Sequence, residues 1–327
     1  MWDGELATMK TRVVSVAYPT IPIIFVASVN ERRVPLHDTM GLAVSDLRRE
    51  TRSETTITAL PGRDGVEFYL EGKPLEERRS RDIERVANVF MEESGSKALL
   101  RIESSNYNIY SGSSDSGAAA LVVGLNELFQ TNFPTERLAE LGNSVSESAL
   151  RSVYGGMNAY IVSGGEPKGM QVASEEDLAG IRIFAMGFNY QTRVSAQEIF
   201  DTCKASPFWK TRLDMVPRWR AEIEEGLKQR DWTRVFSNAE ENCSNAHYMI
   251  ESGGKRSRRK EMMNAVIDVE EIRASGLPVY WTAGGGKVIN AFSWGSEAEE
   301  VLRELKARGQ NPVEYKVAPG AKVISSS

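Results

Sequence analysis

The chain has 327 residues, of which 41% are hydrophobic and 26% are charged, and its formal net charge is −5 at pH 7. This length is more than one hydrophobic core usually holds, so we expect two domains that share a cleft. The acidic balance argues against nucleic acid as the main partner, because that role favours a strongly basic face.

Other features of the composition bear on location. No apolar run approaches the roughly 20 residues that a membrane span requires, and residues 1–10 lack the apolar region of a signal peptide. Cys203 and Cys243 are too few for a disulfide framework or a zinc site. We therefore expect a cytoplasmic protein with no membrane partner, in which the two histidines, His37 and His247, are structural or solvent-facing.

The first third of the chain alternates short β-branched runs with turns marked by proline and glycine, a pattern typical of strands. A helix is expected over residues 79–93, where apolar residues from Ile83 to Phe90 recur at helical spacing. Strands are expected over residues 11–18, 22–29, 41–47, 55–60, 66–72 and 97–104.

A run of serine and glycine, SGSSDSG at residues 111–117, then precedes an apolar, alanine-rich segment at 118–129 that reads as a helix. The first turn of a helix has unpaired N–H groups and roughly half a positive charge, which favours an anion. Glycine allows close approach of the backbone, and serine hydroxyls donate hydrogen bonds. The run therefore predicts a phosphate site, with a simple helix cap as the alternative, although it matches neither the Walker A nor the G-x-G-x-x-G pattern.

The rest of the chain mixes helices and strands without strict alternation, which favours an α+β fold. The Gly- and charge-rich segment 163–177 suggests a boundary between domains at 1–170 and 171–327. The basic run at 253–263, including residues 255–260, is either a solvated loop or a mobile flap that helps neutralise phosphate. Helices are expected over 135–142, 144–154, 195–251 (broken at Pro207 and Pro217) and 296–308, and strands over 157–163, 181–188, the two arms of 277–294 and 313–319.

Several stretches together resemble the GHMP kinase superfamily, in particular its diphosphomevalonate decarboxylase branch and the archaeal mevalonate 3-kinases within it. These stretches are AYPTIPIIFVASVNERRVPLHDTMGLAVS (17–45), SGSSDSGAA (111–119), SESALRSVYGG (146–156) and TAGGG (282–286). The resemblance implies a two-domain fold, with an N-terminal domain laid out like a ribosomal protein domain and a ferredoxin-like C-terminal domain. It also implies ATP and Mg²⁺ as cofactors and mevalonate as substrate. We expect a homodimer, because two-fold assemblies are the commonest among soluble oligomers.

The resemblance assigns roles to individual residues. It implies that Ser113 and Ser114 face the nucleotide phosphates, with Ser114 also near Mg²⁺, and that Ser113, Arg151 and Thr282 lie at the reacting groups. Asp115 is unexpected in a phosphate loop, and we consider that it either binds Mg²⁺ or caps the helix. The residues expected to contact the nucleotide are Asn106, Asn108, Ser111, Gly112, Ser113, Ser114 and Ser116.

Two positions, Thr282 and Glu147, favour a kinase over a decarboxylase. Thr282 occupies the place of an aspartate in the decarboxylase pattern, and a threonine cannot act as a carboxylate base. Phosphoryl transfer tolerates this change because positioning and electrostatics supply most of its rate. We therefore expect phosphorylation of the 3-hydroxyl of mevalonate in an archaeal isoprenoid pathway without decarboxylation. The alternatives are a (di)phosphomevalonate or mevalonate 3,5-bisphosphate decarboxylase and, more remotely, a nucleic-acid-binding protein or a catalytically silent member of the fold.

The segment 146–156 carries the expected substrate specificity. Glu147 falls where the decarboxylases receive a phosphorylated tail, and a carboxylate there repels a phosphate but accepts a hydrogen bond from a hydroxyl. The resemblance implies that Arg193 orients Glu147 and that Arg151 holds the mevalonate carboxylate; a surface pair between Glu147 and Arg151 is the alternative. Tyr18 either lines the substrate pocket or is a buried strand residue.

Overall fold

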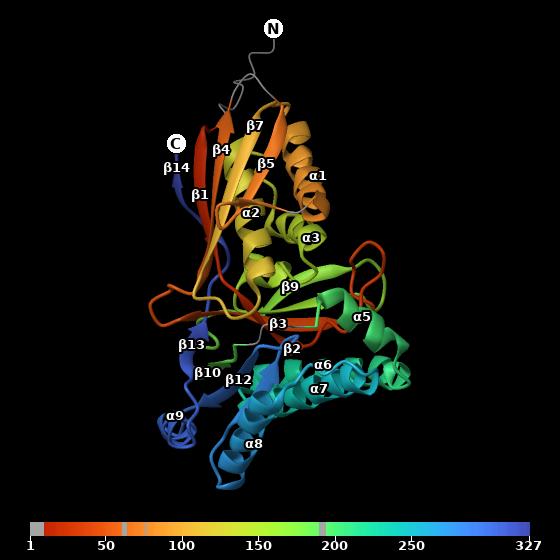
Figure 1. The fold of residues 1–327 in the computed structure, drawn as a ribbon, viewed down its shortest axis with the longest axis vertical. Helices are drawn as coiled ribbons and strands as arrows, with labels where there is room; N and C mark the ends of the chain where they lie inside the picture. Colours follow the sequence, from red (N-terminus) through yellow and green to blue (C-terminus); the bar gives the residue numbers. More distant parts are fainter. Residues whose placement is uncertain (1–9, 61–63, 76, 190–193) are drawn as a thin grey trace.

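The computed structural model describes residues 10–60, 64–75, 77–189 and 194–327. It has the expected α+β character, with two β-sheets stacked along the long axis of the molecule and helices packed on both (Figure 1). None of the helices in these ranges is both long and apolar enough to cross a membrane.

The upper layer is a six-stranded sheet in which β5 and β7 are parallel and the other neighbours are antiparallel. Alternate residues of β4 are buried because one face of the sheet packs on helix α2, whose alanine-rich surface allows close approach. In order across the sheet, the strands are β14 (Lys322–Ser326), β1 (Arg12–Ala17), β4 (Arg52–Leu60), β7 (Leu99–Tyr107), β5 (Gly65–Leu70) and β6 (Lys73–Pro74). The helices of this layer are α1 (Glu77–Ser94), α2 (Ser113–Phe129), α3 (Thr135–Val145) and the short α4 (Leu150–Tyr154).

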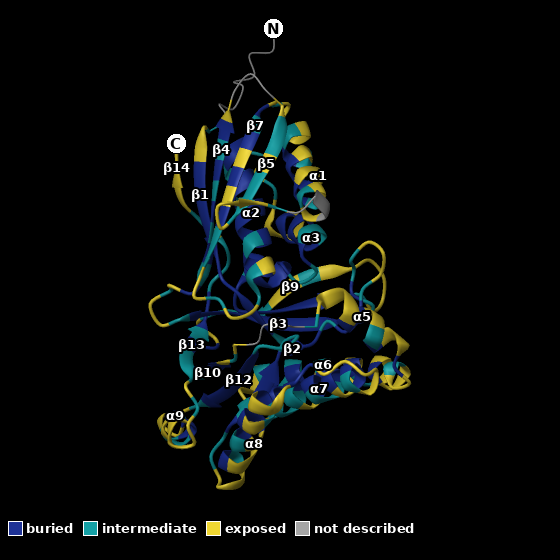
Figure 2. Cartoon of the chain, viewed as in Figure 1, coloured by how far each residue is buried: buried dark blue, intermediate teal, exposed yellow. Residues whose placement is uncertain are grey.

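The lower layer is an eight-stranded antiparallel sheet. Longer helices pack beneath it, and each of these helices buries one side and exposes the other (Figure 2). Its strands, in order, are β11 (Tyr280–Ala283), β12 (Val288–Trp294), β10 (Ile181–Gly187), β13 (Val313–Val317), β3 (Thr39–Asp46), β8 (Met157–Ile161) and β9 (Lys168–Ala173), with β2 (Thr20–Ile24) also paired to β3. The helices are α5 (Ala196–Ala205), α6 (Trp209–Gln229), α7 (Trp232–Ser252), α8 (Lys260–Ala274) and α9 (Ala298–Ala307).

The lower sheet combines strands from both sides of the expected boundary near residue 170. Strand β9 lies within the segment expected to be a linker, where it forms a hairpin with β8. Strand β14 follows what the sequence indicated as the last strand, and it returns to pair with β1 in the upper sheet. The division at 1–170 and 171–327 stays a prediction, although each sheet contains strands from both sides of it.

Three helix boundaries differ from the expected ones. Helix α2 begins at Ser113 rather than at 118, so three serines of the loop lie in its first turn. The expected helix over 144–154 is instead the end of α3, a turn at 146–149 and α4. Pro217 lies inside α6 and the break comes after Gln229; a proline costs one internal hydrogen bond, but the buried face of α6 keeps the helix continuous.

The interior of the lower layer contains both histidines and one fully buried arginine. Arg212 Nε donates to His37 Nε2 at 3.1 Å, and its Nη2 donates to the carbonyl of Phe25 at 2.7 Å. His247 Nδ1 lies 2.8 Å from Ser257 Oγ. Burial lowers the pKa of each histidine to about 3, so both rings are neutral. The expectation that they are structural is confirmed.

Gly155 makes a tight contact between two segments that connect the upper and lower layers. Gly155 has φ 68° and ψ −179°, a conformation that is essentially restricted to glycine, and it forms a β-bridge with Pro319. A Cβ at Gly155 would lie 2.1 Å from the backbone N of Gly320. The turn after α4 and the segment before β14 therefore fit together only without a side chain at this position.

We expect Gly155→Ala to lower the free energy of unfolding by about 3 kcal/mol or more, because it adds backbone strain to a clash with main-chain atoms. Gly164→Ala is the matched control: its φ is also positive, at 95°, but no atom lies within 4 Å of the added Cβ. We expect about 1–2 kcal/mol there. Denaturant unfolding of both variants measures the difference, and equal losses would contradict the role of this contact.

Candidate active site

The phosphate loop, residues 111–117, lies where the upper and lower layers meet, at the start of α2 (Figure 1). Gly112 adopts the left-handed conformation with φ 81°, and a Cβ there would lie 2.6 Å from the backbone N of Thr20. Gly112 at the N-cap has no side chain to cap α2, so, within the described part of the chain, the N–H groups at its start stay available to a ligand. Ser111 and Ser114 are exposed and Ser113 is partly exposed. These features favour an anion site over a simple helix cap.

The other expected nucleotide contacts separate into two groups. Asn108 is exposed, with φ 54°, just before the loop. Ser116, by contrast, is fully buried, and its Oγ lies 2.7 Å from Ser53 Oγ on β4. Ser53 in turn donates to Asn106 Oδ1 at 2.6 Å. Because its hydroxyl faces the sheet, Ser116 supports the loop from within. Its expected contact with phosphate stays a prediction, and its burial does not favour it.

Asp115 forms the centre of a buried cluster of hydroxyl groups. It is 6% exposed, and its Oδ1 accepts hydrogen bonds from Ser146 at 2.7 Å and Ser148 at 2.9 Å. Its Oδ2 accepts from Thr20 at 2.5 Å and from Ser148 at 2.9 Å. Asp115 therefore neither caps the helix nor turns an open oxygen toward a metal ion. It joins α2, β2 and the turn at 146–149.

Arg151 lies next to this cluster, on α4. The residue is 5% exposed, and its Nη2 donates to the carbonyl of Ile24 at 3.4 Å. Burial lowers the pKa of Arg151 to about 10, and the negative charge of Asp115 opposes this shift. A Cβ at Gly41 would lie 2.3 Å from Arg151 Cδ, so β3 must carry glycine beneath this side chain.

Glu147 lies in the turn before α4 and not in a helix, so it does not share a helical face with Arg151. Its side chain is 12% exposed and forms an ion pair with Arg33, from the loop between β2 and β3. Arg33 has φ 62°, a left-handed conformation that is uncommon for arginine. Arg193, the residue expected to orient Glu147, lies outside the described residues. The ion pair with Arg33 replaces the alternative of a surface pair between Glu147 and Arg151.

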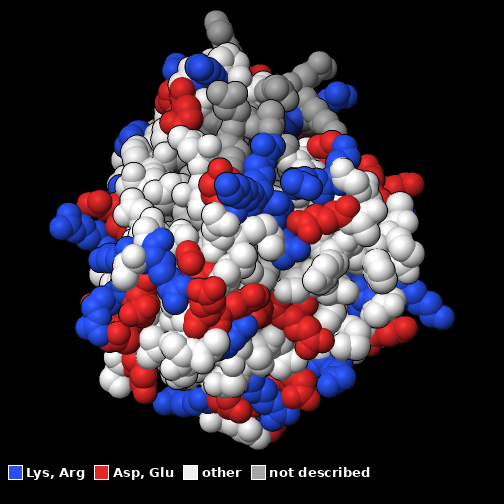
Figure 3. All heavy atoms as spheres, turned by 60° about the horizontal axis from the view of Figure 1, so that its bottom comes forward, with Lys and Arg blue, Asp and Glu red and all other residues white. Residues whose placement is uncertain are grey.

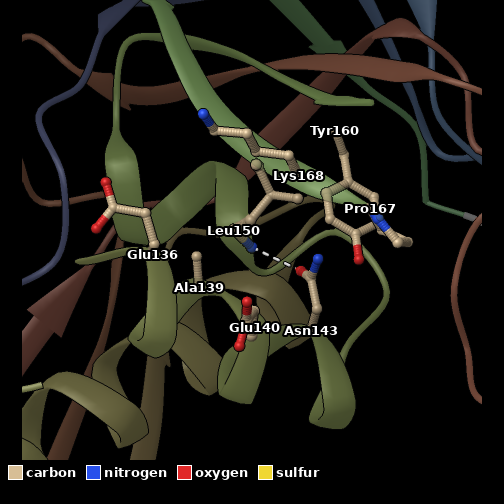
Figure 4. Close-up of a pocket in the computed structure, with 9 residues that line it drawn as sticks. Glu136, Ala139, Glu140, Asn143, Leu150, Tyr160, Pro167 and Lys168 are labelled. Atoms are coloured by element: carbon tan, nitrogen blue, oxygen red, sulfur yellow. Dashed lines mark hydrogen bonds between the residues drawn. The ribbon is translucent and has the colours of Figure 1, made fainter. Parts of the chain in front are cut away.

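The turn that carries Glu147 is anchored by α3. Asn143 Oδ1 accepts from the backbone N of Leu150 at 2.8 Å, which fixes the first residue of α4 (Figure 4). A cavity of about 50 Å³ lies beside this contact, lined by residues of α3 and α4 and by Tyr160, Pro167, Lys168 and Gly169. That volume suits one or two water molecules and is too small for a substrate.

The glycine-rich turn between β11 and β12 meets the phosphate loop. A Cβ at Gly284 would lie 3.4 Å from Ser111 Oγ, and one at Gly286 would lie 3.1 Å from the carbonyl of Ser257. Thr282, on β11, is fully buried, and its Oγ1 has no hydrogen-bond partner within the described ranges. Lys287 follows the turn and is partly exposed. The strand, turn and strand expected over 277–294 are confirmed.

Two other expectations concern residues beside the site. Tyr18 is buried, as the second alternative expected, but it lies just after β1 rather than in a strand. It packs with Ala43 and Ala318, and the Arg49 guanidinium lies 5.5 Å from its ring centroid. The basic run at 253–263 is largely exposed before α8, as expected of a solvated loop, and two of its cations are held in ion pairs. Lys255 pairs with Glu198 at 2.7 Å, Arg258 pairs with Glu251 at 2.9 Å, and α8 begins at Lys260.

Sequence reasoning did not identify Arg33 or Thr20 as residues of this site. Both lie in the stretch 17–45 that carries the family resemblance, but neither shows a spacing that connects it to Glu147 or Asp115. Their positions follow from the pairing of β2 with β3, which brings this stretch beside the start of α2.

Comparison with known proteins shows the family and the fold to which the chain is similar. Residues 24–168 match the model of the diphosphomevalonate decarboxylase-like N-terminal domain. The chain is 30% identical to a mevalonate 3-kinase of Thermoplasma acidophilum, over 84% of this chain and 86% of that protein. It is 27% identical to a mevalonate-3-kinase of Picrophilus torridus, over 87% and 88% of the two chains. The crystal structure of the Thermoplasma enzyme with mevalonate 3-phosphate and ADP bound superposes with a TM-score of 0.86, at 26% identity, over 97% of this chain and all of that one.

These matches extend over nearly the whole chain, and the fold is that of a two-domain GHMP-type enzyme. The chain belongs to the family of the mevalonate 3-kinases, within the diphosphomevalonate decarboxylase-like branch of the GHMP kinase superfamily.

We expect Gly112→Ala to weaken MgATP binding about tenfold or more, because the added Cβ would collide with β2 and move the loop away from its anion-binding geometry. Gly117→Ala is the matched control in the same run, since its Cβ would meet only Ser104 Oγ at 4.0 Å. Calorimetric titration with MgATP measures both. Unchanged affinity in Gly112→Ala would remove this loop from the nucleotide site.

Proposed function

We propose that this protein is an ATP-dependent kinase that phosphorylates the 3-hydroxyl of (R)-mevalonate, giving mevalonate 3-phosphate and ADP without decarboxylation. The observation that carries the proposal is the placement of Glu147 and Arg151 around a single turn, which Asp115 ties to the start of α2. Residues 147–151 thus place Arg151, which can hold the mevalonate carboxylate, and Glu147, which can accept from the 5-hydroxyl, beside the loop 111–117 that is suited to phosphate.

The nucleotide would bind with its phosphates on the phosphate loop. Ser111, Ser113 and Ser114 have exposed or partly exposed hydroxyls there, and the uncapped N–H groups of α2 would face the negative charge. When bound, Mg²⁺ would neutralise phosphate charge, held by the Ser114 hydroxyl and the phosphate oxygens; Asp115 is already filled by hydroxyl donors.

The substrate would lie between Arg151 and Glu147. A guanidinium can hold a carboxylate through two parallel hydrogen bonds, and burial strengthens such a pair. Glu147 would accept a hydrogen bond from the 5-hydroxyl, whereas a 5-phosphate there would meet a like charge. Thr282 provides no carboxylate base. A largely dissociative transfer does not need one, because the bond to the leaving oxygen is nearly broken before the new bond forms.

The remaining expectations accompany this proposal. An archaeal isoprenoid pathway in the cytoplasm fits the two archaeal relatives. The homodimer and the absence of a nucleic-acid partner stay predictions. On the face shown in Figure 3, lysine and arginine are interleaved with aspartate and glutamate over the lower layer, which does not favour a polyanion there.

Incubation with MgATP and (R)-mevalonate tests the proposal directly. We expect one new phosphomonoester signal in the ³¹P spectrum, ADP in equal amount and no CO₂, with the product mass equal to that of mevalonate plus one phosphoryl group. No product from mevalonate, together with release of CO₂ and inorganic phosphate in step with ADP when 5-phosphomevalonate or 5-diphosphomevalonate is supplied instead, would establish the decarboxylase alternative and reject the kinase proposal.

Replacing Glu147 tests the basis of specificity. We expect Glu147→Ser to lower the ratio of kcat/KM for mevalonate to that for 5-phosphomevalonate by about tenfold or more, since it removes a repulsive charge and leaves Arg33 free to attract a phosphate. Glu103→Ser, on an exposed face of β7, removes the same charge far from the turn and should not change this ratio. An unaltered ratio in Glu147→Ser would contradict selection by repulsion.

A further inference from the structure

The role of Asp115 is not explained by nucleotide binding. A buried carboxylate in the first turn of a helix occupies a place where a phosphate is favoured, yet it would repel that phosphate. Its environment shows what it binds instead: three hydroxyl groups, from Thr20, Ser146 and Ser148, all within hydrogen-bond distance of its two oxygens.

A count of protons gives the consequence. Each serine or threonine hydroxyl has one hydrogen to donate. An ionised carboxylate only accepts, so all three hydroxyls direct that hydrogen toward Asp115. Ser146 and Ser148 flank Glu147 in the turn that would receive the substrate tail. Ser146 is buried and Ser148 is partly exposed. With its proton engaged, Ser148 presents only oxygen lone pairs, which accept from a hydroxyl and repel a phosphate.

The balance of charge in this part of the site also disfavours a phosphorylated tail. Arg151 is buried beside the cluster, and Asp115 is the carboxylate whose charge bears on it. Arg33, by contrast, forms a direct ion pair with Glu147. Two cations and two carboxylates therefore leave this part of the site without an excess of positive charge. A tail with one or two further negative charges finds neither free donors nor net attraction.

We propose that Asp115 is a positioning residue that sets substrate selectivity by holding the hydroxyl protons of Thr20, Ser146 and Ser148 away from the substrate tail. It acts together with Glu147, which repels a phosphate directly, and it does so without touching the substrate. This inference rests on the proposed function, since it requires the tail of mevalonate to lie beside the turn at 146–149.

The test compares kcat/KM for mevalonate and 5-phosphomevalonate in four forms of the full chain: wild type, Asp115→Ala, Ser148→Ala and the double variant. We expect Asp115→Ala to shift the ratio toward 5-phosphomevalonate by about tenfold, mainly through a lower KM, because released hydroxyls can then donate to the phosphate. Ser148→Ala alone should leave the ratio within about twofold, since its proton was already engaged. Thr20 and Ser146 are buried and Ser148 is partly exposed, so Ser148 is the hydroxyl that a phosphate can reach. In the double variant we therefore expect most of the gain to be lost.

Asp115→Asn covers the case in which the alanine variant does not fold. It keeps the volume and one acceptor oxygen but removes the charge, so we expect a smaller shift of about threefold in the same direction. Unchanged ratios in the folded variants would overturn the role of Asp115. A gain that persists in the double variant would show that charge alone is responsible and would reject the role of the hydroxyl protons. Failure of the proposed function is a separate outcome, because wild-type protein would then not phosphorylate mevalonate.

Discussion

The site depends on the close contact between the start of α2 and the first residue of β2. Gly112 allows the two backbones to approach, and the hydrogen bond between Thr20 and Asp115 fixes them. Because α2 is packed on the upper sheet and β2 is paired in the lower one, this contact aligns the two layers. The turn that carries Glu147 is bound to the same carboxylate, so residues 111–117 and the turn at 146–149 are held by one group.

The positions of the charged side chains of Arg151 and Asp115 are tightly constrained by their neighbours. Arg151 can lie under β3 only because residue 41 is glycine, and its burial makes its ionised state costly without a nearby anion. Asp115 provides that anion, while its hydroxyl partners offset the loss of solvation. Specificity in such a site comes as much from the groups already engaged with one another as from those left to bind a ligand.

The sequence predicts most elements of the fold because their patterns are local. The alternation in β4, the apolar stripe of α1 and the glycine-rich turn before β12 each follow from neighbouring residues. What it does not predict depends on distant partners: β14 is a short strand rich in serine that forms only because β1 offers an edge, and α6 continues through Pro217 because its buried face is held by the sheet. The same holds for the site. The motif at 146–156 is recognisable in the sequence, but the ion pair of Glu147 with Arg33 is not, because the two residues are distant in sequence.

The pairing of β14 with β1 also has a consequence for how the chain reaches this structure. Lys10 and Ser326, separated by 316 positions, meet in a hydrogen bond beside that pair. Closing so large a loop is slow, and until it happens β1 presents an open edge that can pair with another molecule. The upper sheet is therefore complete only once β14 has returned to β1, and until then that edge of a newly synthesised molecule needs protection.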